Sequence, residues 1–480
     1  MSILVVDVGT SSVRAAIVRP DATIAVERHR QVLPDSPDSG LVEFDALTLA
    51  EVTLELARQV LREGGPIDGV GIATQRASTV VWDRATGVPV GPALGWQDLR
   101  TVGDCLVLQA DGLRFAPNQS ATKLVWLLNT YDPDRSRDLC FGTPDSWIAW
   151  QLSQGELHVT DLSNAAVTGL VDGDAADWDY ALLERLAIPR SMMPTIVDSM
   201  SILGAASALD GAPPIAGILG DQQSSMLGQG IVESGPAKIT FGTGGMLDLI
   251  LGDQRPEFAT RGGGGTFPIV AWRRDGQSTW GLEAIMLSAG TNIEWLRDDL
   301  GIIESSEQSH EIASQCSSSD GVMFVPALLG LGTPKWDYGA RGTLLGLTRG
   351  AGRPEIVRAV LEGVAHRGAD LVDAANIDGA PDIASIRIDG GMSRNPTFVQ
   401  ALADATQRVV EVSPVVEATT MGGAFAAGLA IGTWGNLGDI AETWSPASSV
   451  EPGNPLDRDR WADAVERASA WFPELSGLDF

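Results

Sequence analysis

The chain has 480 residues, of which 44% are hydrophobic, and its formal net charge is −29. This length exceeds the size at which one hydrophobic core stops growing, so two large domains are expected. The strong negative charge argues against a nucleic-acid surface, because phosphate backbones are bound through clustered lysines and arginines.

Neither the cysteines nor the N-terminus suggests export. Cys105, Cys140 and Cys316 are widely spaced and form no Cys-x-x-Cys pair, which favours neither a disulfide framework nor a zinc site. The N-terminal segment reaches Asp7 before an export signal could form, and no run of about eighteen apolar residues follows. We therefore expect a cytoplasmic protein without a membrane span.

Two similar hairpins are predicted half a chain apart. In each, a buried strand, a Gly-Thr turn and a returning strand follow one another, at residues 3–6, 7–12 and 13–18, and again at residues 238–241, 242–245 and 246–251. A repeat at half the chain length favours two domains of common architecture that face each other. Turn residues between 228 and 236 suggest a boundary that divides the chain into domains 1–229 and 230–480.

Helices and strands alternate between and after these hairpins. Asp45 can cap a helix that Gly64 and Gly65 end, and strands are expected at 70–74 and 79–82. In the second half, helices are expected to open at Pro354 and at Asn395-Pro396, and a further Gly- and Ala-rich helix covers 422–432. This alternation predicts α/β layers.

The two Gly-Thr turns are candidate phosphate sites. Glycine lets the backbone turn sharply, so that successive N–H groups and the Thr hydroxyl point at one anion. Two such turns on one cleft could hold a triphosphate from both sides, although each on its own is equally consistent with a plain hairpin turn. Neither a G-x-x-x-x-G-K-[ST] loop nor a complete G-x-G-x-x-G follows a strand, so a nucleotide site here is of another kind.

Asp221 is the candidate catalytic base. It follows the apolar run 215–219, which places it at a strand end that opens into a loop. Phosphoryl transfer needs one residue that orients and deprotonates the attacking hydroxyl, while Mg²⁺ offsets charge on the phosphate. Asp221 can be that base, and Asp7 can hold Mg²⁺ directly or through water. The alternative for any single Asp is a turn or a helix cap.

Arg76 and Trp96 suggest a polyol pocket. Arg76 ends the 70–74 strand and offers donors for hydroxyl groups, and the indole of Trp96 offers a face for carbon-bound hydrogens. Trp96 is nearly as consistent with a plain core residue. The Gly390-Gly391 pair lies between a strand and the helix after Asn395, where a flat ligand could approach the backbone. The histidines are scattered and are expected to be structural.

In their order along the chain, these segments are similar to the FGGY carbohydrate kinases, and within that family most like its glycerol kinases. The similarity covers nearly the whole chain and rests on residues 7–12, 71–76, 96–101, 122–126, 220–223, 241–244, 336–342, 346–350 and 389–391. It implies an α/β fold of two ribonuclease-H-like (actin-type ATPase) domains flanking a central catalytic cleft. The first domain would bind most of the sugar or polyol, and ATP would lie between both.

The resemblance also implies roles for individual residues. Asp221 matches the family's general base. The substrate positions are Arg76, Ala77, Trp96, Asn118, Asp221, Gln222 and Met246. The nucleotide positions are Thr10, Ser11, Ser12, Arg14, Thr243, Gly290, Glu294, Gly391 and Asn395.

Four of these positions depart from the family pattern. Ala77 stands where Glu is usual, Asn118 replaces a pocket Tyr, Met246 replaces Phe, and Glu294 replaces a nucleotide-contacting Gln. Loss of a carboxylate that holds a substrate hydroxyl should weaken glycerol binding and leave room for a longer chain. We therefore expect ATP-dependent phosphorylation of glycerol, or of a polyol or sugar with four or five carbons.

Three other functions stay open at this stage. A ketose or pentulose kinase like the xylulokinases would be distinguished by its substrates. A non-catalytic sugar or nucleotide sensor would lack Asp221, Asp7 or the Gly-Thr turns, all of which are present. An actin- or chaperone-like ATPase that acts on proteins is disfavoured by the Arg76 and Trp96 segments. The oligomeric state is also open, with a homo-oligomer as one alternative.

Overall fold

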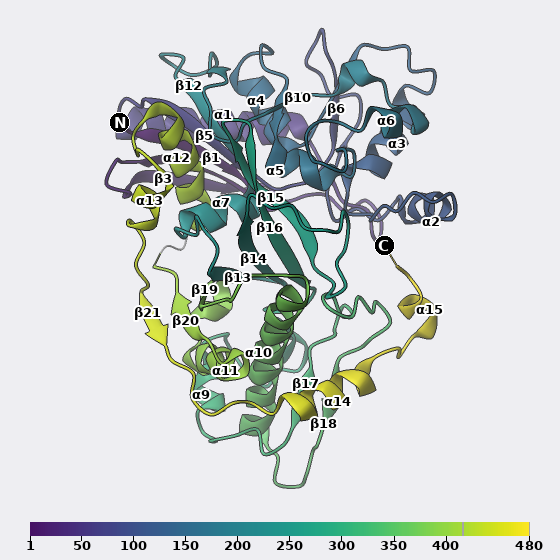
Figure 1. Cartoon of the computed structure of the whole chain (residues 1–480), viewed down its shortest axis with the longest axis vertical. Coiled ribbons are helices and arrows are strands. Elements are labelled where there is room, and N and C mark those ends of the chain that lie inside the picture. The colour runs from purple at the N-terminus through teal and green to yellow at the C-terminus, as the bar shows by residue number, and fades with distance from the viewer. Residues whose placement is uncertain (415–416, 480) are drawn as a thin grey trace.

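The computed structural model describes residues 1–414 and 417–479, which form two α/β halves, one above the other in Figure 1. The sheet of the upper half has the strand order β11 (Gly204–Ala205), β12 (Pro214–Gly220), β5 (Gly69–Thr74), β1 (Ile3–Val8), β2 (Ser12–Val18) and β3 (Ile24–Gln31). The sheet of the lower half has the order β15 (Phe267–Arg274), β16 (Gln277–Met286), β14 (Gly245–Gly252), β13 (Pro236–Phe241), β19 (Ser385–Asp389), β20 (Val409–Val412) and β21 (Ser448–Val450).

The two sheets share one central topology. In the first, β3, β2 and β1 form an antiparallel meander, and β5 and β12 then continue the sheet in parallel with β1. In the second, β16, β14 and β13 form the meander, and β19 and β20 continue it in parallel. The repeat inferred from the two hairpins is therefore confirmed, and it extends to five strands in each half.

Small two-stranded sheets and helices complete the halves. The pairs are β4 (Glu43–Phe44) with β7 (Ala93–Leu94), β6 (Val80–Asp83) with β8 (Leu139–Gly142), β9 (Val159–Asp161) with β10 (Thr195–Val197), and β17 (Met323–Val325) with β18 (Thr343–Leu345). The helices of the first half are α1 (Ala46–Gly64), α2 (Val102–Ala110), α3 (Ser120–Tyr131), α4 (Pro144–Leu152), α5 (Leu162–Ala165), α6 (Tyr180–Arg185) and α7 (Asp221–Gly228). Those of the second are α8 (Thr291–Glu294), α9 (Gln308–Ala313), α10 (Arg353–Ile377), α11 (Pro396–Thr406), α12 (Ala418–Ile431), α13 (Leu437–Ala441), α14 (Arg458–Ala468) and α15 (Pro473–Ser476).

Both faces of the first sheet are buried, as the apolar sequence of β1 requires. Leu4, Val6 and Val8 point into one core with α1, while Ile3 and Val5 point into another with α12. The Asp45 carboxylate caps α1 by accepting hydrogen bonds from the backbone N–H groups of its first turn, as predicted.

Helix α12 belongs to the second half of the sequence but packs against β1, β5 and β12 of the first sheet. It also packs along α7, and the contact depends on glycine: a Cβ atom on Gly228 would lie 1.8 Å from Ala418 O. The expected Gly- and Ala-rich helix is thus present, and its small residues allow the close approach. In Figure 1 α7 lies beside α12, where the upper and lower halves meet.

The second sheet has one apolar face, and on its other face charged residues stand beside apolar ones such as Ile250; we call this second face the polar face. Residues at alternate positions of its central strands, among them Ile239, Leu247 and Leu282, pack against α10 and α11. Of the intervening positions, Lys238, Asp248 and Glu283 are charged: Lys238 contacts Gln222 of α7, and Glu283 contacts Arg76, which follows β5. This polar face therefore lies on the boundary between the two halves. From the lower half, the C-terminal segment (yellow in Figure 1) returns to α2, where Gln109 Nε2 donates to Asp479 O at 2.9 Å.

Two local predictions were wrong. Asp7 lies within β1 and not in the turn, because the ladder between β1 and β2 continues as far as Val8 and Val13. Asp221 does not open a loop but begins α7 directly after β12. Among the described residues no helix is long and apolar enough to cross a membrane. The domain boundary at residues 229 and 230 stays a prediction.

Candidate active site

Three parallel strands of the first sheet end at one edge. Val8 of β1, Thr74 of β5 and Gly220 of β12 are register partners, so the residues beside them meet there. Asp7, Arg76 and Asp221 therefore come together although they are far apart in the sequence. Ligands of open α/β sheets commonly bind at such an edge, beyond the carboxyl ends of the strands.

Asp221 and Arg76 are direct neighbours. Arg76 Nε lies 3.6 Å from Asp221 Oδ1, and the Asp221 carboxylate also accepts a 2.8 Å hydrogen bond from the backbone N–H of Gln222. Gly220 makes this approach possible, since a Cβ atom there would lie 2.7 Å from Arg76 Cδ. Arg76 and Asp221, predicted from the sequence as substrate residue and base, are thus brought together.

Glu283 of β16 holds the other side of Arg76. Arg76 Nη2 donates to Glu283 Oε2 at 2.5 Å, and the two side chains are only 10% and 8% exposed. Arg76 Nη1 is buried and has no hydrogen-bond partner among the described residues. Because unpaired buried donors are costly, this nitrogen is the natural donor for a bound molecule.

The carboxylates of the site have perturbed pKa values. Burial by the surrounding protein atoms raises the pKa of Asp221, although 29% of its side chain is exposed. The positive charge of Arg76 lowers this pKa but does not outweigh burial. Burial likewise raises the pKa of Glu283 to about 7 against the effect of Arg76. For Arg76, burial favours the neutral form, but Glu283 and Asp221 outweigh it and raise the pKa of the guanidinium. A raised pKa makes Asp221 a stronger proton acceptor than an ordinary Asp.

The first Gly-Thr turn connects β1 to β2 at the same edge. Gly9 N donates to Ser12 O at 2.9 Å, which closes the turn, and Thr10 Oγ1 accepts a 3.1 Å hydrogen bond from Trp96 Nε1. Ser11 is exposed at the tip. Trp96, 38% exposed, thus joins the proposed substrate pocket to the proposed phosphate turn. Arg14 is the register partner of Asp7.

Asp7 has the chemistry of a magnesium ligand. Its side chain is 14% exposed, Arg14 Nη1 lies 4.0 Å away, and burial raises its pKa to about 7, with Asp221 adding to the rise. A divalent cation would relieve the unfavourable effect of Asp221 on the ionised Asp7 carboxylate, and oxygen ligands suit Mg²⁺. Arg14 itself pairs with Glu417 and lies 3.4 Å from Glu27, which limits its charge toward a phosphate. Among the described residues, no group of three or more His, Cys, Asp or Glu side chains gathers as a metal site.

The glycine-rich loops of the second half also converge. The second Gly-Thr turn, between β13 and β14, contacts the loop before α8: Gly290 N donates to Gly242 O at 2.8 Å, and Ala289 N to Thr243 O at 2.9 Å. Gly390 has φ of 85° and lies against Phe241, where a Cβ atom would be 2.3 Å from its carbonyl oxygen. Thr243, Gly290 and Gly391 therefore border one edge of the second sheet.

Two predicted nucleotide residues are placed less directly. Asn395 caps α11 by accepting from Phe398 N, and its amide donates to Ser309 Oγ at 2.9 Å, so its side chain is already paired. Glu294, the last residue of α8, is exposed. Their roles toward a nucleotide stay predictions.

The three substrate-pocket residues that differ from the family pattern lie in different surroundings. Ala77 has φ of 60°, is 7% exposed, and its carbonyl accepts from Ser120 Oγ at 2.9 Å. Asn118 is exposed two residues before Ser120. Met246 is half-buried on β14, on the polar face of the second sheet opposite Ile285. The small side chain of Ala77 and the flexible one of Met246 are consistent with a wider pocket.

Sequence reasoning missed three charged residues beside the site. Lys238, Asp248 and Glu283 occupy neighbouring register positions on β13, β14 and β16. Lys238 and Asp248 are completely buried, with Nζ and Oδ2 3.0 Å apart, and Lys238 Nζ donates to Gln222 Oε1 at 2.9 Å. Each residue is the only charged one in its strand, and that pattern could have revealed them.

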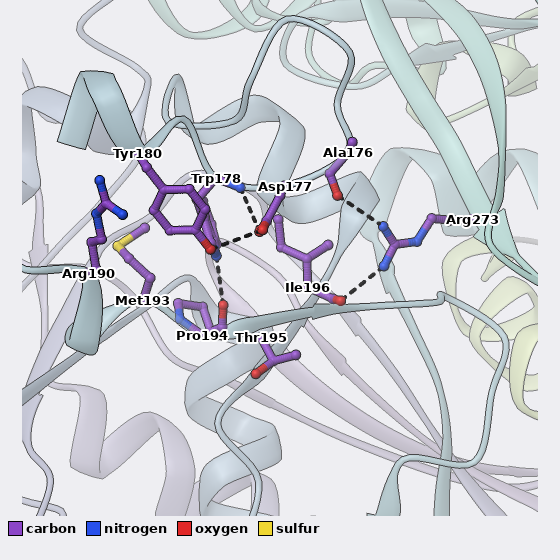
Figure 2. A pocket seen from close by; sticks show the side chains of 10 residues that line it. All are labelled: Ala176, Asp177, Trp178, Tyr180, Arg190, Met193, Pro194, Thr195, Ile196 and Arg273. Carbon is purple, nitrogen blue, oxygen red and sulfur yellow. Dashed lines mark hydrogen bonds between the residues drawn. The ribbon is translucent and has the colours of Figure 1, made fainter. Parts of the chain in front are cut away.

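A separate hollow of about 380 Å³ lies between η2 (Arg190–Met192) and β10 of the first half and Arg273 of β15 in the second (Figure 2). Arg190 stacks over the Tyr180 ring at 4.7 Å, and Arg273 donates to Ile196 O at 3.0 Å. None of the residues predicted from the sequence lines it. The candidate active site is therefore not this hollow but the edge of the first sheet where Asp7, Arg76 and Asp221 meet.

The fold and the site define a two-domain α/β kinase of the ribonuclease-H-like, actin-type class. Models of the FGGY family of carbohydrate kinases match the chain, the N-terminal domain at residues 2–228 and the C-terminal domain at residues 237–431. The chain belongs to this family and is a carbohydrate kinase.

Known proteins similar to the chain agree with that assignment. A glycerol kinase of Aromatoleum aromaticum is 38% identical over 98% of this chain and 99% of its own length. The structure of Plasmodium falciparum glycerol kinase with ADP matches with a TM-score of 0.89 at 28% identity, covering 97% of this chain and 98% of that one. A xylulose kinase from Lactobacillus acidophilus, 21% identical with a TM-score of 0.85 over 99% and 96%, shares the fold. The recognition of the family from its motifs is confirmed.

Proposed function

We propose that this kinase transfers the γ-phosphoryl group of ATP to a hydroxyl of a small neutral polyol, glycerol or a chain of four or five carbons. The observation that carries the proposal is the Asp221 carboxylate, which lies 3.6 Å from Arg76 at the edge of the first sheet where β1 and β2 place the first Gly-Thr turn. Similarity to glycerol kinases supports a polyol as the acceptor.

In this proposal each residue has a defined task. Asp221 accepts the proton of the attacking hydroxyl, and Arg76 Nη1 orients a neighbouring substrate oxygen. The Gly-Thr turns with Thr10 and Thr243 hold the phosphates through backbone N–H groups and hydroxyls. Asp7 would hold Mg²⁺, which neutralises charge on the phosphates when it is bound. Enclosure between the two halves excludes water that would otherwise hydrolyse ATP.

The width of the pocket bears on the length of the substrate. Ala77 provides a methyl group where the family usually has a carboxylate, so one hydrogen-bond acceptor for a substrate hydroxyl is missing. Loss of such a partner costs about 1–3 kcal/mol of binding. We therefore expect a four- or five-carbon polyol to have a higher kcat/KM than glycerol.

A coupled ADP-release assay across glycerol, erythritol, threitol, pentitols and ketoses tests the substrate. Asp221→Asn tests the base: the amide has the same size but cannot accept the proton, so kcat should fall by about 10²–10⁴-fold while ATP still binds. Asp210→Asn, the same change at an exposed position, serves as the control. Wild-type turnover in Asp221→Asn would exclude Asp221 as the base.

A further inference from the structure

Lys238, Asp248 and Glu283 form a lateral row across β13, β14 and β16, which we call the charged row. Each is the register partner of the next, so all three side chains leave the same face of the sheet. The opposite face of these strands carries Ile239, Leu247 and Leu282 in the apolar core with α10. The charged row thus faces the first half of the molecule, where α7 begins with Asp221.

Lys238 fixes the orientation of the Gln222 amide. Its ammonium group has only donors, and it lies 2.9 Å from Gln222 Oε1. The oxygen end of the amide must therefore face Lys238, and the NH₂ end is turned away from it. Asp248, 3.0 Å from Lys238 Nζ, holds the ammonium in place at a site from which solvent is excluded. The part of Gln222 that is directed away from Lys238, and that can reach a substrate, is consequently the NH₂ donor.

Glu283 does the same for Arg76. By accepting from Nη2 at 2.5 Å it occupies one edge of the guanidinium, while Nε faces Asp221 at 3.6 Å. The remaining nitrogen, Nη1, is the one that is buried without a partner among the described residues. Arg76 therefore presents one unpaired nitrogen, Nη1 with its two N–H groups, in a fixed direction beside the Asp221 carboxylate, which is an acceptor.

We propose that Lys238, Asp248 and Glu283 are positioning residues of this kinase, which fix Gln222 and Arg76 as two donors beside Asp221 and so select an uncharged acceptor whose oxygens accept both hydrogen bonds. The inference rests on the proposed function, because it takes Asp221 as the base. Hydroxyl and carbonyl oxygens both satisfy the two donors, so polyols and ketoses fit.

The charge of the site excludes sugar acids. Both cations near the base are already paired, Arg76 with Glu283 and Lys238 with Asp248. A substrate carboxylate would therefore meet Asp221 and Glu283 without a free cation to balance it, and an uncompensated buried charge is strongly unfavourable. These carboxylates already repel one another. Burial raises the pKa of Glu283, and the negative charges of Asp248 and Asp221 raise it further.

The first test replaces both residues of the buried ion pair, Lys238 and Asp248, in one variant. In Lys238→Met/Asp248→Leu no charge is left uncompensated, so the fold is retained, but the Gln222 amide loses its anchor. The KM for the best neutral acceptor should rise about 10-fold or more, with the KM for ATP changed less than about 2-fold. The control is Arg358→Met/Glu362→Leu, a half-buried ion pair on α10 whose atoms lie 2.8 Å apart and which has no hydrogen bond to α7 or Arg76. It should leave both KM values unchanged.

The second test uses Glu283. Glu283→Gln keeps an acceptor for Arg76 Nη2 and should retain kcat/KM within about 10-fold, whereas Glu283→Ala should lower it about 100-fold. Equal kinetics for the two variants, or an unchanged acceptor KM in Lys238→Met/Asp248→Leu, would overturn the positioning role. Phosphorylation of gluconate by the wild type as fast as of polyols would overturn the selection for uncharged acceptors. If the wild type phosphorylates no polyol or ketose, the proposed function fails, and the same variants are then compared on the acceptor that it does use.

Discussion

Gly220→Ala displaces Arg76 without removing any functional group, although its Cβ atom would also lie 2.7 Å from Gln223 Oε1. Gly220 has φ of −63° and ψ of 151°, which an alanine adopts freely, so the backbone is not strained. The added Cβ atom, however, would lie 2.7 Å from Arg76 Cδ and 2.8 Å from Cγ. Carbon atoms in contact are about 3.5–4.0 Å apart. Arg76 must therefore move by about 1 Å, and it cannot simply swing away because Glu283 holds its far end.

A displacement of this size near reacting atoms costs about 100-fold in rate. We expect kcat/KM for the acceptor to fall about 100-fold, which corresponds to about 2.7 kcal/mol of transition-state stabilisation. The assay is ADP release at varied acceptor and saturating ATP, with urea unfolding to verify that the fold is intact. Gly103→Ala is the control, because a Cβ atom there meets nothing within 4 Å and α2 should only be stabilised. Wild-type kcat/KM in Gly220→Ala would refute the argument that the Arg76 position matters.

Two further predictions concern stability. Gly228→Ala should destabilise the protein by about 3 kcal/mol, since its Cβ atom would lie 1.8 Å from Ala418 O, and an unchanged urea midpoint would contradict the contact between α7 and α12. His366, buried and stacked on Trp461 at 4.8 Å, has its pKa lowered from 6.5 to about 4 by burial and by Arg458. Its neutral form stabilises the fold fully above pH 6.5, and the stability is lost as the pH falls toward 4. When the pH falls from about 7.5 to about 5, the free energy of unfolding measured in urea should decrease by about 2 kcal/mol more in the wild type than in His366→Phe. Equal decreases would show that His366 does not contribute to the pH dependence of stability.

Local patterns allowed most of the architecture to be predicted from the sequence. The two hairpins, the Asp45 and Asn395 caps and the Gly- and Ala-rich helix depend on residues near one another in the chain, and each forms as expected. The placement of α12 against the first sheet could not be predicted in this way. It depends on a long-range contact in which Gly423 O fits into the space left by the missing side chain of Gly71.

The candidate site was likewise predicted from the sequence only in part. Motifs identified Arg76 and Asp221, and parallel strands that end at one edge explain why they meet. Asp221 was expected in a loop because its helix is short and polar at the start; α7 contains only the eight residues Asp221–Gly228. The charged row was missed because its members become neighbours only through strand register, which fixes Lys238 opposite Asp248 and Asp248 opposite Glu283.

The beginning of α7 at Asp221 changes how the proposed base is understood. A carboxylate in the first turn of a helix is stabilised by the positive end of the helix dipole, and Asp221 also accepts from Gln222 N at 2.8 Å. These contacts and Arg76 favour the ionised form, while burial favours the protonated form and raises the pKa overall. The base is therefore held rigidly and made more basic than a solvated Asp. Because Gln222 on the next position is fixed by Lys238 of the other half, the orientation of α7 depends on contact between the two halves. We expect an open arrangement of the halves to lose the alignment of base and donors together, so that transfer requires closure over the acceptor.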